Sequence, residues 1–227
     1  MVLMATKARR TERRTDALSK ERIVEAAIEI LDTRGESALT FRALTARLAT
    51  GAGAIYWHVA NKNELLAATT NEVIASVMTE VVTDAEPREA IRALALGVFD
   101  AIDAHPWVGT QLSREPWQSA MLQVFEGIGG QLQALGLPEG AEFDCASALV
   151  NYVLGVAGQN AANARLHTGE TDRSTFLANV AARWAQLDPA QYPFVRQVAT
   201  QLRDHDDREQ FLAGIDLILA GIETARG

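Results

Sequence analysis

A phenol, an indole, an imidazole and an ammonium group crowd one short stretch of this chain. The stretch from Tyr56 to Lys62 reads YWHVANK. Such a mixture is poor core material, but its polar groups can donate hydrogen bonds to phosphate oxygens. The same residues could instead face solvent on one helix of a larger bundle. The residue types therefore indicate a nucleic-acid contact and leave a solvated helix as the alternative.

Two short helices joined by a turn would position these side chains. Thr40 is a good N-cap for the first helix, because its hydroxyl can accept from a free amide. The apolar residues that follow have the spacing of one buried helical face: Phe41, Leu44 and Leu48. Gly51 and Gly53 interrupt that pattern, and a second short helix follows with Ile55 and Val59 on one side. This order predicts a helix-turn-helix at about residues 40–59, whose second helix can lie in a DNA major groove.

The run AIYWHVANKNELL resembles the end of the DNA-binding domain in the tetracycline-repressor family of transcriptional regulators. The preceding run SKERIVEAAIEILDTRGESALTFRALTARLA resembles the first two helices of that domain. Order, spacing and residue type agree over the first third of the chain. The resemblance implies an all-α protein with a three-helix DNA-binding head and a helical body that binds a small molecule and forms a homodimer.

The resemblance and the residue types together predict these DNA-binding residues: Thr40, Arg42, Ala52, Gly53, Ala54, Tyr56, Trp57, His58 and Lys62. The family often has polar base-reading side chains at the start of the second helix, where this chain has only glycine and alanine. An alanine methyl can touch a thymine methyl but forms no hydrogen bond. Base readout would then fall on Arg42, which can bind guanine through two hydrogen bonds, helped by Thr40. The aromatic residues, His58 and Lys62 would mainly hold phosphate, and DNA shape could add specificity.

Charge is distributed unevenly along the 227 residues. Residues 1–67 carry 11 Lys and Arg against 8 Asp and Glu, whereas residues 68–227 carry 10 against 21. A polyanion would be attracted to the first part and repelled by the second, which suits a DNA-reading head on an acidic body. A chance asymmetry is the alternative. No apolar run reaches the ~18 residues that span a bilayer, and a single cysteine, Cys145, fits a reducing compartment. We therefore expect a cytoplasmic protein with no membrane association and no signal peptide.

Three regions are expected. Residues 1–18 are predicted to be a disordered basic tail, which could enter a minor groove or be a solvated leader. Residues 19–62 form the DNA-binding domain, whose first helix begins after Ser19 and stops at Gly35. Residues 63–227 form the ligand-binding and dimerisation domain, joined to the head by a strut helix at 61–84. Further helices are expected at about 87–104, 116–135, 142–166, 173–187, 192–202 and 208–224, with no strand pattern.

The body is expected to hold a pocket for a small molecule. Its predicted lining is Trp107, Trp117, Gln118, Met121, Phe125, Tyr152, Gln159, Asn160, Asn163 and His167. A mostly apolar wall with a few amides and one imidazole suits a drug-sized ligand, although the same residues could fill core or face solvent. Relative to the tetracycline repressor itself, Met78 and Thr110 replace histidines associated with the drug and its magnesium. These departures from the tetracycline repressor predict a different, largely apolar effector and no metal.

Small and apolar residues on the long and the last helix predict the dimer interface: Gly155, Gly158, Ala162, Phe211, Ile215, Ile218 and Ile222. Small residues let helices approach closely, and the resemblance implies a four-helix interface across a two-fold axis. Internal core packing is the alternative. A symmetric dimer would place two recognition helices ~34–36 Å apart and read a palindromic operator on double-stranded DNA.

We predict a dimeric transcriptional regulator, a repressor released from its operator by a small effector. The alternative is a helical small-molecule-binding or interaction protein that has lost sequence-specific readout. An enzyme is not expected, because the sequence has no Gly-rich phosphate loop, metal-ligand cluster or nucleophile–base pair at recognisable spacing. No cofactor is expected.

Overall fold

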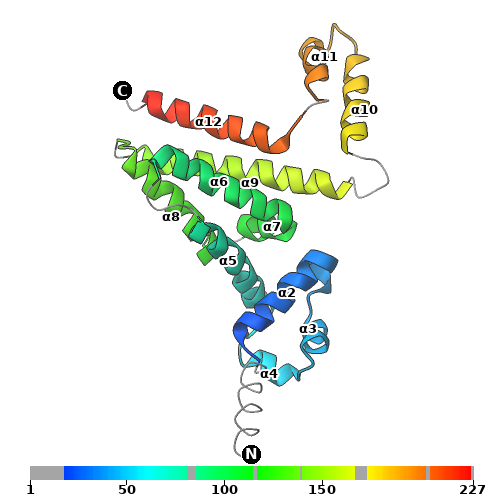
Figure 1. The fold of residues 1–227 in the computed structure, drawn as a ribbon, viewed down its shortest axis with the longest axis vertical. Coiled ribbons are helices and arrows are strands. Elements are labelled where there is room, and N and C mark those ends of the chain that lie inside the picture. The colour runs from blue at the N-terminus through cyan, green and yellow to red at the C-terminus, as the bar shows by residue number, and fades with distance from the viewer. Residues whose placement is uncertain are drawn as a thin grey trace, which may run out of the picture.

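The structure is a computed structural model, and it describes residues 18–80, 85–114, 117–138, 140–166, 173–202 and 205–225. All regular elements in these ranges are helices, as predicted. Figure 1 shows a small head at one end, a helical body, and a short helical arm at the far side of the body. Within the described ranges, no helix has the length and apolar character needed to cross a membrane.

The head consists of α2 (Lys20–Arg34), the 3-10 turn η1 (Glu36–Ala38), α3 (Phe41–Leu48) and α4 (Ala52–Tyr56). Ser19 caps α2 by accepting a hydrogen bond from the Arg22 amide at 3.3 Å, and Gly35 ends it with φ 74°. The apolar stripe of α2 is buried and forms a single core with residues of the second and third helices: Ile23, Ala26, Ala27, Ile30, Leu31, Leu44 and Ile55. Of the face predicted for α3, Leu44 is buried, whereas Phe41 and Leu48 are half-buried against this core. The three-helix head is confirmed.

The turn between α3 and α4 differs from the prediction. The interrupting residues were expected to be Gly51 and Gly53, but Gly51 has an ordinary extended conformation at φ −84° and Gly53 lies inside α4. The left-handed residue that redirects the chain is Ala49, with φ 50° and ψ 45°. A side chain disfavours that conformation, so the turn stores a small amount of backbone strain.

Helix α5 (Lys62–Glu80) follows α4 after a short connection and begins with a reciprocal cap. The Asn61 side chain accepts from the Glu64 amide at 2.9 Å, and the Glu64 carboxylate accepts from the Ala60 amide at 2.8 Å. This pair is a variant of the capping box. Helix α5 packs on α2 in the head and on α6, α7 and α8 in the body, so it is the predicted strut. The predicted end of the strut, at 81–84, lies outside the described residues.

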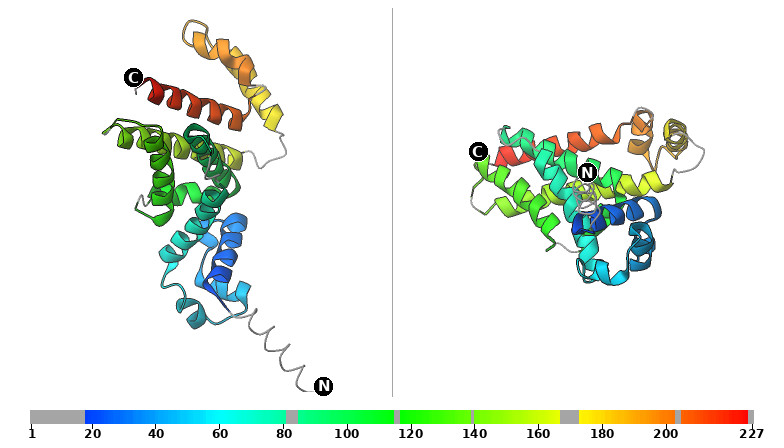
Figure 2. Two further views of the ribbon diagram at one scale, coloured as in Figure 1. Left: turned by 60° about the vertical axis from the view of Figure 1, so that its left-hand side comes forward. Right: turned by 60° about the horizontal axis from the view of Figure 1, so that its bottom comes forward.

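The body packs α6 (Pro87–Ala104), α7 (Pro106–Arg114), α8 (Ser119–Ala134), α9 (Glu142–Leu166) and α12 (Asp207–Ala225) around one apolar core. The predicted bounds of α6 and α9 are confirmed, and α7 begins at Pro106, two residues after α6 ends. Figure 2 shows α9 and α12 side by side, and they are in contact.

The arm consists of α10 (Arg173–Ala185), α11 (Pro193–Val198) and the 3-10 turn η2 (Ala199–Leu202). These elements pack chiefly on one another and stand beside the body (Figures 1 and 2). Only two of the arm's apolar residues, Ala181 and Ala199, are fully buried.

Candidate nucleic-acid interface and body cleft

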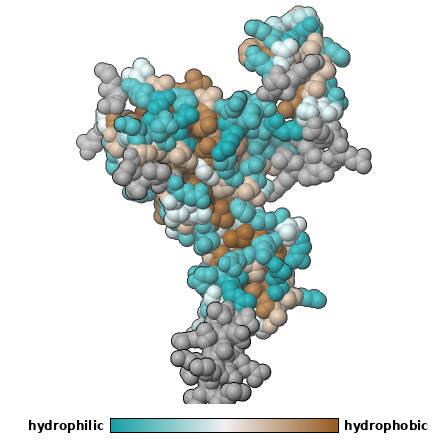
Figure 3. Space-filling view, viewed as in Figure 1, coloured by the Kyte–Doolittle hydropathy of each residue, from teal (hydrophilic) through white to brown (hydrophobic). Residues whose placement is uncertain are grey.

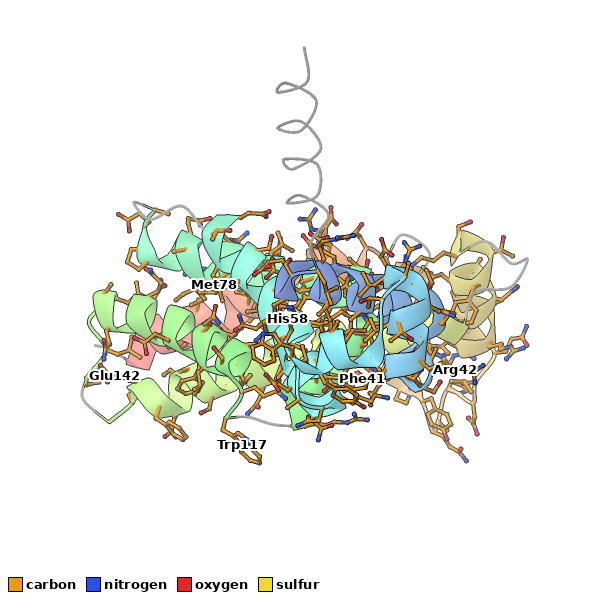
Figure 4. All side chains as sticks on the ribbon, turned by 90° about the horizontal axis from the view of Figure 1, so that it is seen from below. Phe41, Arg42, His58, Met78, Trp117 and Glu142 are labelled. Atoms are coloured by element: carbon orange, nitrogen blue, oxygen red, sulfur yellow. The ribbon has the colours of Figure 1, made fainter. Side chains whose placement is uncertain are left out.

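The side chains predicted to bind DNA lie on or next to α3 and α4, apart from Lys62 at the start of α5. Arg42 is exposed, Tyr56 is 53% exposed and Trp57 is 87% exposed, whereas Ile55 between them is fully buried. Figure 4 looks onto this end of the molecule and shows Phe41, Arg42 and His58 there. An indole this exposed packs little against the described residues, so its presence here favours contact with another molecule.

Stacking of Phe41 on Tyr56 fixes α4 against α3. The ring centroids are 4.4 Å apart and the planes are inclined by 12°. Offset stacking of this kind contributes about 0.5–1.5 kcal/mol beyond the burial of area.

Thr40 and Lys62 have structural partners of their own. The Thr40 hydroxyl accepts from the Ala43 amide at 3.1 Å, and so it caps α3 as predicted. The Lys62 ammonium donates to the Glu36 carbonyl at 2.7 Å, which ties the start of α5 to η1. An ammonium has three donors, so a phosphate contact by Lys62 stays a prediction.

The start of α4 presents backbone rather than side chain. Ala52, Gly53 and Ala54 are exposed, and a Cβ added at Gly51 or Gly53 would have nothing within 4 Å. This surface is open and small, so the helix can approach a partner closely.

The described part of the head carries no excess charge. Residues 18–67 hold six Lys and Arg and six Asp and Glu, so the positive excess of residues 1–67 comes from residues 1–17, outside the described chain. Two of the six acids turn toward the body, where Asp32 binds His105 and Trp107 and Glu36 binds Gln111 and Arg114. A third, Glu29, forms an ion pair with Arg47.

The residues predicted to line a pocket do not surround a single cavity. Trp107 is buried at the junction of head and body, and its indole donates to Asp32 at 2.7 Å. Tyr152 lies between α9 and α12, where its hydroxyl donates to the Phe211 carbonyl at 3.1 Å, and burial raises its pKa. Both have structural partners that the sequence pattern did not reveal.

A second group of these residues lies at and after the start of α8. Trp117 is exposed and projects from the edge of the molecule in Figure 4, whereas Gln118 and Met121 are buried. Phe125 packs on the exposed Phe143 of α9, with ring centroids 5.9 Å apart. Thr110 is exposed on α7, and His167 lies outside the described residues.

Gln159, Asn160 and Asn163 line clefts beside the C-terminal part of α9. The larger cleft has a volume of about 820 Å³ and lies between α6, α9, the arm and the start of α12. Its walls combine apolar with charged residues: Phe99, Phe176, Leu177, Val180, Asp100, Asp103, Arg173, His205, Asp207 and Arg208. Gln159 lines an adjoining cleft of about 520 Å³ that shares Asn160 and Asn163.

Sequence reasoning missed the acidic side of this cleft. Burial raises the pKa of Asp100, although Arg208 binds it at 2.7 Å. Asp103 accepts from the Asn160 amide at 3.2 Å. The i, i+3 spacing of the two aspartates was the available signal, but only the fold brings α12 and the arm against that end of α6. An amide pair between α5 and α8, Gln123 and Asn71 at 2.7 Å, was also missed.

The predicted dimer residues divide into two groups. Phe211, Ile215 and Ile222 are buried inside the chain, where Phe211 stacks on Phe99. They therefore belong to the internal core, which corrects their assignment to an interface. The residues of α9 and Ile218 are half-buried or exposed: Gly155, Gly158, Ala162 and Ile218. Leu217, which is 75% exposed, and Phe143 stand out on the same two helices.

Family models match both parts of the chain. Residues 23–69 match the model described as bacterial regulatory proteins of the tetR family, and residues 84–226 match the tetracyclin repressor-like C-terminal domain. The chain belongs to the tetracycline-repressor family. It is therefore a DNA-binding transcriptional regulator, and the family is not enzymatic.

Individual relatives agree with this assignment. The structure of a transcriptional regulator from Streptomyces coelicolor, described as a TetR, has 52% sequence identity and a TM-score of 0.86 over 93% of this chain and 100% of that chain. An HTH-type transcriptional repressor from Streptomyces coeruleorubidus is 27% identical over 91% of this chain and 78% of its own length. An HTH-type transcriptional regulator from Saccharopolyspora erythraea is 30% identical, but the match covers only 61% of this chain and 59% of that protein.

Proposed function

We propose that this regulator is a homodimeric repressor that binds a palindromic operator through α3 and α4 and is released by a small molecule bound in its body. The observation that carries the proposal is the exposure of Arg42, Tyr56 and Trp57 on and directly after the two helices of the helix-turn-helix. One relative supports repression: a protein that is 27% identical over most of both chains is described as a transcriptional repressor.

We assign base readout to Arg42. The start of α4 is assigned to close approach to the DNA. A guanidinium can donate two hydrogen bonds to guanine, whereas the exposed alanines of α4 can only touch thymine methyl groups. Tyr56 and Trp57 are placed to contact the sugar–phosphate backbone, which holds the head without reading sequence.

The outer faces of α9 and α12 are assigned to the dimer. These helices pack side by side and expose Phe143, Gly155 and Ala162 on α9 and Leu217 on α12. Exposed large apolar side chains and small residues on these two helices suit close packing against the same two helices of a second copy. A two-fold dimer reads a palindrome because each head meets an equivalent half-site.

The cleft of about 820 Å³ is assigned to the effector, because its volume is in the range of drug-sized sites. Its phenylalanine, leucine and valine side chains suit the apolar effector that the sequence predicted, while its aspartates favour a ligand that also carries hydroxyl or basic groups. Asp103, which binds Asn160 across the cleft, lies two residues before His105 at the junction with the head. A ligand that displaced Asn160 would therefore act on the end of α6 and on α7.

Footprinting of the purified protein on DNA flanking its own coding region, at two salt concentrations, tests the proposal. We expect a protected palindrome whose affinity falls steeply with salt, because phosphate contacts release counterions. Arg42→Ala should relax the sequence preference, and Trp57→Ala should weaken binding to every sequence alike. Trp57 is a cleaner probe than Lys62, whose contact with Glu36 also holds the head together.

Two outcomes would contradict the proposal. Protection of DNA without a repeated half-site would exclude binding by a two-fold symmetric dimer. Absence of binding, both to this DNA and to random genomic fragments, would favour the alternative in which the glycine- and alanine-rich start of α4 no longer reads sequence.

A further inference from the structure

One face of α7 points from the body into the head. Trp107, Gln111 and Arg114 have i, i+4 and i+7 spacing, so they lie on one side of the helix. Figure 1 shows α7 between α9 of the body and α2 of the head, and it contacts both helices. In Figure 3 apolar residues are visible where the head meets the body. The polar contacts across this junction therefore lie on an apolar background.

Asp32, near the end of α2, is the first head residue that this face binds. Its Oδ1 atom accepts from the Trp107 indole at 2.7 Å and lies 2.8 Å from Nδ1 of His105. Trp107 is only 4% exposed, so its indole has little access to water as an alternative partner. Buried donors of this kind hold their partners in one position, because an unmade hydrogen bond there is costly.

Glu36, in η1, is the second head residue that this face of α7 binds. Its carboxylate accepts from the Gln111 amide at 3.1 Å and from the Arg114 guanidinium at 2.9 Å. Gln111 is 4% exposed, and so its amide is committed to this contact. The backbone carbonyl of Glu36 also accepts from Lys62 at the start of the strut. Two carboxylates of the head are thus bound by one rigid helix of the body, at two points separated along that helix.

We propose that Asp32 and Glu36 are positioning residues for DNA binding: through them α7 fixes the orientation of the head on the body, and hence the separation of the two heads in the dimer. The inference rests on the proposed homodimer. Two attachment points resist rotation of the head about the strut, which a single point could not do. Neither residue needs to touch DNA for this role.

Distance measurement between the two heads tests the proposal without an operator. A spin label at Ala46→Cys, an exposed position of α3, is introduced into the full chain with Cys145→Ala. Pulsed electron paramagnetic resonance should give a narrow distance distribution for this reference protein and a clearly broader one for the Asp32→Ala, Glu36→Ala double variant, which removes both acceptors. Trp107→Phe, which removes a donor from the body side, should also broaden the distribution.

Glu29→Ala is the matched control, because Glu29 is also a carboxylate of the head but pairs with Arg47 inside the head. The control should keep the narrow distribution, and circular dichroism should show equal helix content in all variants. Absence of any inter-head distance in the reference protein would contradict the homodimer. If the reference protein and the double variant gave equally narrow distance distributions, the positioning role alone would be overturned.

DNA binding supplies the readout that a loss of head stability would not produce. On the protected palindrome the double variant should lose about tenfold in affinity, within the usual range of couplings between sites, while a single half-site should be bound within about twofold of the reference. Its preference for the natural spacing over operators one base pair longer or shorter should also weaken. Equal losses on the palindrome and on the half-site would mean that the two carboxylates act on the head itself, and the proposal would then fail.

Discussion

The ring of Tyr152 on α9 leaves no room for a side chain at Gly214 of α12. Replacing Gly214 by alanine therefore tests how tightly α9 and α12 pack. An added Cβ would lie 1.9 Å from the Tyr152 hydroxyl oxygen and 2.3 Å from Cζ, well inside any real contact. The ring cannot easily move away, because it stacks on Phe211, which in turn stacks on Phe99. Alanine must therefore displace a stacked group of three aromatic rings or separate the two helices.

The size of the effect follows from three contributions. Overpacking costs about 1–3 kcal/mol. Loss of the hydrogen bond from Tyr152 to the Phe211 carbonyl costs about 1 kcal/mol. Alanine gains about 1 kcal/mol over glycine in a helix. We therefore expect Gly214→Ala to lower the free energy of unfolding by about 1–3 kcal/mol.

Urea unfolding followed by circular dichroism, at one fixed protein concentration, measures this change. Gly130→Ala is the control, because a Cβ at Gly130 of α8 has nothing within 4 Å, and it should stabilise by up to about 1 kcal/mol. In a Tyr152→Ala background, Gly214→Ala should lose most of its cost, since the obstructing ring is gone. If Gly214→Ala stabilised the protein as the control does, the close packing of Tyr152 on α12 would be refuted.

Three further predictions concern the turn, the dimer and acid stability. Ala49→Gly should raise the free energy of unfolding by about 1 kcal/mol in urea titrations, because it relieves the left-handed alanine, and an unchanged or lower value would contradict the strain. Leu217→Glu should convert the dimer to a monomer in light scattering and weaken binding to the palindrome, and a dimer that persists would exclude this face. Hydrogen bonding to Arg92 lowers the pKa of Asp216, so this aspartate stabilises the fold above the ordinary pKa of about 4 and loses that effect as the pH falls through the lowered value. Asp216→Asn should accordingly flatten the acid side of the stability–pH profile, and a profile parallel to that of the wild type would be inconsistent with the shift.

Local patterns were sufficient to predict the head. The cap at Ser19, the stop at Gly35 and the cap at Thr40 each join a residue to a partner at most four positions away. Short-range sequence therefore carries the information. The family resemblance rests on the same stretch. The bounds of α6 and α9 could also be predicted, because proline and acidic residues mark their starts.

The tertiary structure decided which side of each body helix faces inward. In α12 the apolar residues extend over more than one face, so periodicity could not tell an internal seam from an interface. The fold buries Phe211 and Ile215 and leaves Leu217 exposed. Likewise Trp107 looked like the wall of a pocket, but its partner Asp32 is 75 residues away in the chain. A pattern repeated every few residues cannot encode a contact across that separation, which exists only once α7 is packed between α2 and α9.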